Sequence, residues 1–156
     1  MAARAALKAT PPAPELIITR VFDAPRALVF AAWAQPEHLA RWWGPQGFVN
    51  IAWQMDVRPG GAWFRRMRSP EGTLFIKRGV YREVMPPERL VFTYVNEAAN
   101  GTQGHETLVT VTFEEQGART RLTLRHTGFE SVEARDAHRG GWSSCMERFA
   151  EYLAAA

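Results

Sequence analysis

Three histidines could take part in chemistry, because an imidazole gains or loses a proton near neutral pH and can act as an acid or a base. His105 and His126 fall at positions predicted to face the apolar side of two strands, and His138 lies in the apolar stripe of a predicted helix. The spacing identifies no residue that would orient one of them as a base. The sequence therefore favours three separate histidines that are bonded within the fold or lie at the rim of a pocket.

Glu83 is the candidate for acid–base catalysis with the most specific rationale. It shares the strand parity of Tyr81 and Gly79. A carboxylate that faced an apolar cavity on this side of the strand would have a raised pKa and could donate or accept a proton. The pattern leaves open which side of the strand faces inward, and this interpretation of Glu83 depends on that orientation.

The other reactive side chains match no known catalytic motif. Cys145 lies between Trp142 and Phe149 in an apolar stripe, as expected for an inert buried thiol. Ser143 and Ser144 lie outside any Gly-x-Ser-x-Gly turn, and the chain has no His-Glu-x-x-His motif and no cysteine pair. The sequence therefore predicts neither a metal site nor a cofactor, and it favours binding over catalysis.

Six tryptophans are the most prominent feature of the chain. Some must pack in the core, whereas Trp53, Trp63 and Trp142 fall on faces predicted to point between a sheet and a helix, where they could line a ligand cavity. Trp42 and Trp43 cannot point the same way on one helix, so we expect one to pack and the other to lie at the pocket mouth. The predicted ligand-binding residues are Trp53, Met55, Trp63, Met67, Tyr81, Phe92, His105, Val109, His126, His138, Trp142 and Met146.

Hydrophobic periodicity and turn residues predict the elements that would position these side chains. A strand at 15–22 is followed by short helices at 25–34 and 36–43. Further strands are predicted at 48–57, 62–69, 74–84, 89–96, 105–115 and 119–127, and a long helix at 132–153. Because the gaps between consecutive strands are short, the strands should pair antiparallel.

Two of these elements carry a more detailed expectation. Simple alternation places five apolar residues of the strand at 48–57 on one face. They are Val49, Ile51, Trp53, Met55 and Val57. In the long helix, Gly140 and Gly141 predict a bend, a later effective start, or a partner packed closely against the backbone.

The predicted architecture is α+β. A curved antiparallel sheet of about seven strands wraps around the long C-terminal helix, and two short helices follow the first strand. Residues 15–153 are expected to form a single domain, preceded by a flexible Ala- and Pro-rich tail at 1–14. Curvature of the sheet leaves space beside the helix, where a small apolar ligand could bind.

The composition of the 156 residues argues against several classes of protein. No apolar run reaches the ~18–20 residues of a membrane span. A single cysteine fits a reducing compartment, so a cytoplasmic protein is predicted. The net charge of +3 comes from arginines scattered among acidic residues, which argues against nucleic-acid binding.

An ordered series of short motifs extends across residues 15–153. They are Phe22-Asp23-Ala24-Pro25-Arg26, Pro36-Glu37-His38-Leu39, Trp42-Trp43-Gly44-Pro45, Asp56…Pro59-Gly60-Gly61, Gly79…Tyr81…Glu83, Pro86-Pro87-Glu88-Arg89-Leu90, and Thr127-Gly128-Phe129 followed by Gly141-Trp142. The series resembles the activator of heat shock protein 90 ATPase homologue family, which belongs to the START-like (SRPBCC) superfamily. This resemblance implies a helix-grip fold, in agreement with the predicted order of elements.

The resemblance implies several possible functions, because the superfamily includes lipid and sterol carriers, hormone receptors, polyketide cyclases and co-chaperone domains. Together with the aromatic inner face, it favours a small hydrophobic ligand bound between the sheet and the C-terminal helix. One alternative is a chaperone-associated protein that activates the heat shock protein 90 ATPase. The other is a cyclase- or dehydratase-type enzyme that uses the same cavity, with Glu83 as its candidate catalytic residue.

Overall fold

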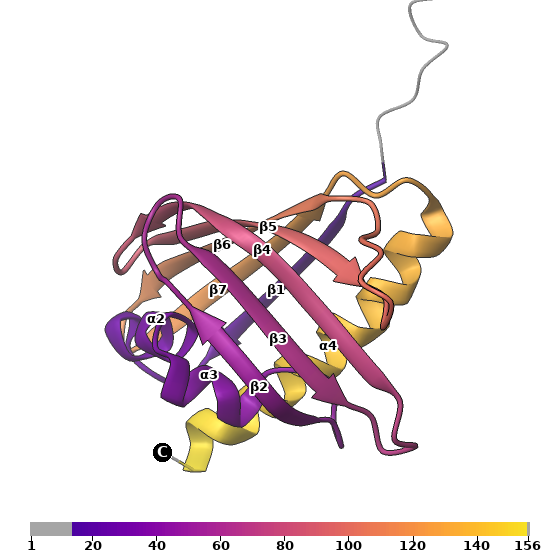
Figure 1. Cartoon of the computed structure of the whole chain (residues 1–156). Coiled ribbons are helices and arrows are strands. Elements are labelled where there is room, and N and C mark those ends of the chain that lie inside the picture. Colours follow the sequence, from indigo (N-terminus) through magenta and orange to yellow (C-terminus); the bar gives the residue numbers. More distant parts are fainter. Residues whose placement is uncertain (1–13, 156) are drawn as a thin grey trace, which may run out of the picture.

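The computed structural model describes residues 14–155 (Figure 1). Within these residues the chain forms one seven-stranded antiparallel sheet and three helices. The tail predicted at 1–14 lies outside the described residues, apart from Pro14. Among the residues described, no helix is long and apolar enough to cross a membrane.

The elements follow one another in the predicted order, with small changes at their ends. Strand β1 (Leu16–Phe22) leads into the short helices α2 (Arg26–Ala34) and α3 (Pro36–Trp42). The later elements are β2 (Val49–Met55), β3 (Ala62–Arg68), β4 (Leu74–Met85), β5 (Arg89–Glu97), β6 (Thr107–Gln116), β7 (Arg119–Thr127) and α4 (Val132–Ala155). The strand order across the sheet is β1-β7-β6-β5-β4-β3-β2, and neighbouring strands are antiparallel.

The sheet is curved, and α4 runs along its concave side while α2 and α3 lie toward one end (Figure 1). Large side chains of α4, among them Met146 and Phe149, are buried in one core with Leu122 and Leu124 of β7. A curved sheet with one apolar face and a single long amphipathic helix bury each other's apolar surfaces in this arrangement. The predicted α+β helix-grip architecture is confirmed.

Helix α4 is continuous over 24 residues, including Gly140 and Gly141. Ser131 satisfies a free backbone donor at its start, since its Oγ accepts a hydrogen bond from the N–H of Ala134 at 3.1 Å. A Cβ atom added at Gly140 would meet nothing within 4 Å, whereas one at Gly141 would lie 4.0 Å from Pro45 Cγ. The expectations of a later helix start and of a partner packed closely against the backbone are therefore wrong, because α4 begins at Val132 and even an added Cβ atom would only just touch a neighbour at Gly141.

The predicted single face of β2 is wrong, because a β-bulge between Asn50 and Ala52 interrupts the pairing with β3. A bulge adds one residue to a strand and reverses the alternation of its side chains. Asn50 therefore turns toward the short helices, and its Nδ2 donates to the carbonyl oxygens of Ala40 at 2.9 Å and Trp43 at 3.0 Å. The exposed apolar residues of this edge strand are Val49, Ile51 and Trp53.

Gly79 of β4 makes room for a tryptophan that crosses its strand. Trp63 of β3 is its cross-strand partner, and Trp63 Nε1 donates to the carbonyl oxygen of Thr93 in β5 at 3.2 Å. A Cβ atom at Gly79 would lie 2.6 Å from Trp63 Nε1 and 1.8 Å from Thr93 O. A residue without a side chain is therefore required at this point of the sheet.

We predict that Gly79→Ala lowers the free energy of unfolding by about 2 kcal/mol or more, because the added methyl group displaces Trp63 and breaks its hydrogen bond. Gly140→Ala is the matched control. It places the same methyl group in open space on a helix, where alanine is favoured by about 0.5–1 kcal/mol. Urea unfolding measures both changes, and equal stability of the two variants would contradict this account of Gly79.

Candidate ligand-binding cavity

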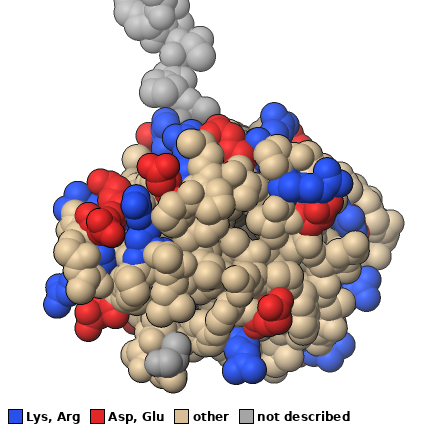
Figure 2. All heavy atoms as spheres, turned by 90° about the vertical axis from the view of Figure 1, so that its left-hand side faces the viewer, with Lys and Arg blue, Asp and Glu red and all other residues tan. Residues whose placement is uncertain are grey.

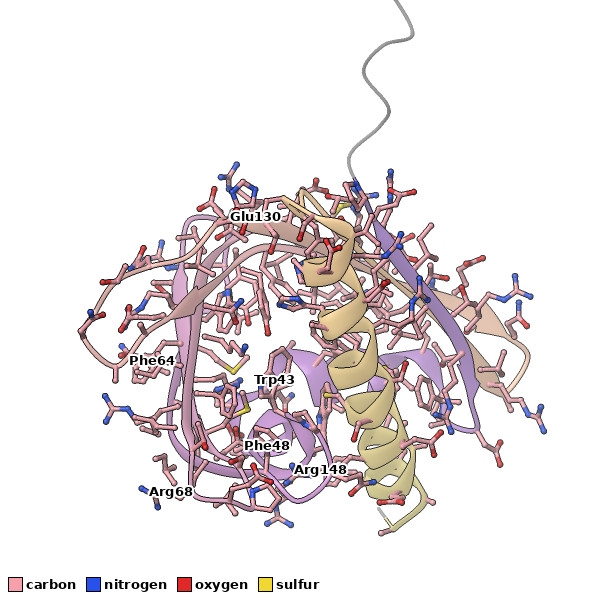
Figure 3. The ribbon with its side chains drawn as sticks, turned by 90° about the vertical axis from the view of Figure 1, so that its right-hand side faces the viewer. Trp43, Phe48, Phe64, Arg68, Glu130 and Arg148 are labelled. Carbon is pink, nitrogen blue, oxygen red and sulfur yellow. The ribbon has the colours of Figure 1, made fainter. Side chains whose placement is uncertain are left out.

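A cavity of about 260 Å³ lies between the sheet and the first half of α4. Its walls come from β3, β4, β5, α4 and the loop that follows α3. The lining residues are Trp43, Gly44, Pro45, Phe48, Met67, Phe75, Lys77, Tyr94, Ala137, His138, Gly141, Trp142 and Cys145. In the view of Figure 3, Trp43 lies in the interior between the sheet and α4, with Phe48 near the loop below it. Most of this lining is apolar, as in sites for small organic ligands.

The cavity lies where α4 carries small side chains. Ala137, Gly141 and Cys145 follow one another at intervals of four residues, which places them on one face of the helix, and all three line the cavity. Phe149 is the next residue in this series, and it is fully buried in the core, with its ring centroid 4.3 Å from that of Trp42. Helix α4 therefore fills the space beside the sheet at Phe149 and leaves it open at Gly141.

Trp142, a wall of the cavity, is oriented by a chain of buried hydrogen bonds. Its Nε1 donates to Nδ1 of His126 at 3.0 Å. His126 Nε2 then donates to the hydroxyl of Thr107 at 2.6 Å, and this hydroxyl donates to the carbonyl oxygen of Tyr94 at 2.9 Å. His126 is fully buried, and burial is the main cause that lowers its pKa to about 3. His126 is thus a neutral acceptor that positions a wall of the cavity.

Arg148 of α4 holds the loop that forms another wall. Its Nη1 lies 3.1 Å from the carbonyl oxygen of Trp43, 3.3 Å from that of Pro45 and 2.9 Å from that of Phe48. Figure 3 shows Arg148 beside this loop, near Phe48. The backbone N–H of Gln46 also donates to Ser144 Oγ of the same helix, at 2.8 Å. The loop is therefore tied to α4 across the mouth of the cavity.

A polar group interrupts the apolar lining at Lys77. The ammonium group donates to Oδ1 of Asn96, and Asn96 Nδ2 lies 3.4 Å from His138 Nε2. His138 Nδ1 donates to the carbonyl oxygen of Ala134 at 2.8 Å, so Nε2 is free to accept from Asn96. The contacts link Lys77, Asn96 and His138 into one hydrogen-bonded group at the cavity.

Burial changes the proton affinities of the groups that line the cavity. It lowers the pKa of Lys77 to about 8 and, as the largest of several causes, lowers the pKa of His138. It raises the pKa of the Cys145 thiol to about 12 and places the pKa of Tyr94 well above its usual value. Near neutral pH, Cys145, His138 and Tyr94 are therefore uncharged, whereas Lys77 is largely protonated.

A second, much smaller cavity of about 10 Å³ lies on the other side of Trp43. It contains the side chain of Arg65, which is 1% exposed and lies with its Cζ 5.6 Å from the centroid of the Trp43 ring. Arg65 Nη2 donates to Sδ of Met55 at 2.8 Å, but its Nε and Nη1 atoms have no hydrogen-bond partner among the described residues. Burial lowers the pKa of Arg65 to about 10, so this guanidinium remains charged at neutral pH.

The residues predicted to bind a ligand fall into three groups. Met67, His138 and Trp142 line the larger cavity, whereas Trp63, Tyr81 and Phe92 line the smaller one. Four more pack in or against the core away from both cavities: Met55, Val109, His126 and Met146. Of the tryptophan pair, Trp42 packs in the core as predicted, whereas Trp43 is itself buried between the two cavities and not at a pocket mouth.

Trp53 pairs with Arg65 and so lies on the predicted inner side of the sheet but outside the cavities, whereas the predicted inward position of His105 is wrong. Trp53 follows the bulge in the edge strand β2, is 41% exposed and lines neither cavity. Strand β6 begins at Thr107, so His105 precedes it in an exposed loop, where its Nε2 donates to the carbonyl oxygen of Gly128 at 2.7 Å. A place on the edge strand leaves Trp53 outside the cavities, and the later start of β6 removes His105 from the inner face.

Glu83 is also displaced by a β-bulge. The pairing of β4 with β5 shifts between Tyr81 and Glu83, so Tyr81 pairs with Phe92 and Glu83 pairs with Val91. Neighbouring residues of β5 face opposite sides, and the parity that Glu83 shares with Tyr81 in the sequence is therefore lost. Glu83 lines neither cavity and forms a surface ion pair with Arg89 at 3.2 Å. The hypothesis of a carboxylate with a raised pKa inside the cavity is wrong for this residue.

Several lining residues were not predicted from the sequence. Pro45 lies in a loop, where periodicity gives no signal, and Phe48 precedes β2 although the sequence predicted it as the first residue of that strand. Lys77 did give a signal, because it shares the parity of Gly79 and Tyr81 on β4, both of which face the interior. A lysine is rarely buried, however, and parity alone does not override that preference. The remaining unpredicted residues of the wall are Gly44, Phe75, Tyr94, Ala137, Gly141 and Cys145.

The described surface carries charges of both signs. On the face shown in Figure 2, Lys and Arg side chains are interspersed with Asp and Glu around a largely uncharged centre. Among the ion pairs of the described residues, Arg20 pairs with Glu147 at 2.9 Å and Arg125 pairs with Glu15 at 2.9 Å. The arginines are thus scattered among acids, in keeping with the pattern of the sequence.

An antiparallel sheet that wraps a long helix and leaves a cavity between them defines a START-like domain of the helix-grip type. The family described as "Activator of Hsp90 ATPase homolog 1-like protein" matches residues 23–154. The chain therefore belongs to this family, which confirms the family predicted from the motifs. A comparison with curated proteins gave no match.

Solved structures share this fold. The crystal structure of an AHSA1 protein from Silicibacter pomeroyi is 30% identical, with a TM-score of 0.84 over 91% of this chain and 99% of that one. A solution structure of a protein from Arthrobacter aurescens is 27% identical, with a TM-score of 0.82 over 92% of this chain and 88% of that one. A protein from Mycobacterium smegmatis is 25% identical, with a TM-score of 0.77 over 91% of each chain.

We predict that acid destabilises the protein through His126. Its pKa is about 3 in the folded state and about 6.5 when exposed, so below pH 6.5 the unfolded chain binds a proton that the folded protein does not. His126 should therefore lower the free energy of unfolding by up to about 1.4 kcal/mol for each unit by which the pH falls. The free energy of unfolding can be measured by urea denaturation at several pH values between about 4.5 and 6.5. Its slope against pH should be shallower for His126→Gln than for the wild type and unchanged for His105→Gln. Equal slopes for His126→Gln and the wild type would contradict this assignment.

Arg148→Met should loosen the loop at the cavity mouth, because three carbonyl oxygens lose their charged donor. We expect faster amide hydrogen exchange at residues 44–48 and a loss of about 1–3 kcal/mol in the free energy of unfolding. Arg139→Met, at an exposed position of the same helix, is the control and should change neither quantity. Unaltered exchange of the loop in Arg148→Met would show that other contacts hold it.

Proposed function

We propose that this protein binds a small hydrophobic molecule in the cavity between the sheet and α4. The observation that carries the proposal is an apolar cavity of about 260 Å³. Specific hydrogen bonds hold its walls in place. Trp142 is oriented through His126, and the loop after α3 is held by Arg148. Walls fixed in this way support a largely preformed site, which lowers the conformational cost of binding.

The volume supports a ligand of modest size. A protein cavity of about 150 Å³ lined by apolar side chains holds benzene. A cavity of about 260 Å³ has room for one to two fused rings or for an acyl chain of similar volume. The aromatic wall made by Trp43, Tyr94 and Trp142 suits a flat apolar molecule, because aromatic rings pack well in stacked and edge-on contacts.

Two other functions follow from the family and from the cavity. Activation of the Hsp90 ATPase rests on the description of the family, and it predicts that the chain raises the ATP hydrolysis rate of an Hsp90 partner. A cyclase or dehydratase would have to use groups other than Glu83, such as Lys77, His138 or Tyr94 at the cavity. The residues of the cavity support either of these functions less than they support the binding of a small molecule.

A cytoplasmic location is part of the proposal. Cys145 lines the cavity as a free thiol, and burial raises its pKa to about 12. A reducing compartment would keep this thiol in the form that packs against an apolar ligand.

The adjacent glycines of α4 provide a direct test of the site. Gly141 lines the cavity, and Gly140 has open space around it. We predict that Gly141→Phe fills the cavity and weakens the binding of an aromatic probe at least tenfold, whereas Gly140→Phe binds like the wild type. The probes are 2-naphthoate and its neutral amide, 2-naphthamide, measured by isothermal titration calorimetry.

For molecules of this size we expect a wild-type Kd on the order of 0.1 mM for the better probe. Native mass spectrometry of protein purified without detergent would reveal a ligand that co-purifies. If neither probe binds and no ligand co-purifies, or if the two phenylalanine variants bind equally well, the proposed site is wrong.

A further inference from the structure

We infer that the cavity selects amphipathic acids, and that the ammonium group of Lys77 is the counter-charge for the carboxylate of the ligand. This inference rests on the proposed function and specifies its ligand class. The apolar part of such a ligand would occupy the space among the aromatic side chains, and its acidic group would lie at Lys77. Within the described residues, this ammonium group is the charged group that lines the cavity.

The surroundings of Lys77 satisfy its hydrogen bonding in part but leave its charge unbalanced. Its Nζ donates to Asn96 and lies 5.7 Å from the ring centroids of both Phe75 and Tyr94. Within residues 14–155, no Asp or Glu lies at ion-pair distance from Lys77, and none lines the cavity. Even a partly buried charge without a counter-ion is unfavourable, so an anion delivered by a ligand would be favoured at this position.

A second cation, which is fully buried, strengthens this preference. Arg65 of β3 is the cross-strand partner of Lys77 of β4, so both side chains leave the sheet on its inner side. Arg65 also lacks an acidic partner among the described residues, and two of its nitrogen atoms make no hydrogen bond there. The charged ends of the two side chains reach different strands, Arg65 toward Met55 of β2 and Lys77 toward Asn96 of β5. The inner side of the sheet thus holds two cations without an acidic partner among the described residues, and this net positive charge favours a negative charge between the sheet and α4.

The other titratable groups around Lys77 do not supply the missing charge. Tyr94 of β5 and Cys145 of α4 have raised pKa values, and His138 of α4 and His126 of β7 have lowered ones. All four are therefore uncharged between about pH 7 and pH 9. Lys77, with its pKa lowered to about 8, is the group that changes charge in this range. The pH dependence of acid binding consequently reports on Lys77.

The test compares 2-naphthoate with 2-naphthamide, which differ in charge but hardly in shape. For the wild type we expect naphthoate to bind at least tenfold more tightly than the amide at pH 7. The association constant of naphthoate should fall about tenfold between pH 7 and pH 9, as Lys77 loses its proton, while that of the amide stays constant.

Lys77→Met should lower the affinity for naphthoate at least tenfold and change the affinity for the amide by no more than about twofold. Lys77→Arg should retain the preference for the acid. Arg66→Met is the matched control for loss of one positive charge, because Arg66 is exposed on the neighbouring strand β3, and it should leave both affinities unchanged. Lys77→Met removes a desolvated charge and should fold. If it does not, the pH dependence of the wild type still decides the question.

The outcomes separate this inference from the proposed function. If both probes bind equally well and neither pH nor Lys77→Met changes the preference, the role of Lys77 is wrong, while the cavity remains a hydrophobic site. If Arg66→Met weakens naphthoate as much as Lys77→Met does, the effect is one of overall charge and the inference is likewise overturned. If neither probe binds to the wild type, the proposed function fails, and this inference fails with it.

Discussion

The structure depends on the burial of one face of α4 by a curved sheet. Phe149 and Met146 are almost completely enclosed, and burial of side chains of this size stabilises the fold by about 1.5–3 kcal/mol each. On the same face of the helix, Gly141 and Ala137 lie about two and three turns before Phe149, and there no large side chain fills the space beside the sheet. One rigid element thus both closes the core and leaves the cavity beside it.

The polar groups inside this fold differ in whether their burial is compensated by neighbouring groups. His126 exchanges hydrogen bonds with Trp142 and Thr107 and is uncharged, so its burial is compensated. Lys77 and Arg65 are charged, and the structure gives them hydrogen bonds or aromatic neighbours but no acidic partner among the described residues. The satisfied hydrogen bonds of His126 are typical of a rigid wall. Cations without an acidic partner in the described part of the chain, such as Lys77 and Arg65, are typical of a site where another molecule supplies the counter-charge.

The sequence was sufficient to predict the order of elements and the helix-grip fold, because long periodic segments and short connections agreed with each other. It failed at single side chains where backbone irregularities change the parity of a strand. The bulges near Asn50 and Glu83 are such places, and neither leaves a signal that alternation can detect. Lys77 was missed for another reason: its parity was correct for an inward position, but a lysine is usually assigned to the surface. The loop residue Phe48 required tertiary contacts that no local pattern contains.

The division of the cavity walls between a helix and a strand has a consequence for how this fold can diversify. Side chains at Ala137, Gly141 and Cys145 set the room available, and they lie on α4, whereas the charge lies on β4 at Lys77. A change at one set of positions leaves the other in place. For the proposed ligand, size and charge are therefore separable traits, and substitutions in one element would alter the room in the cavity or its charge without altering the other.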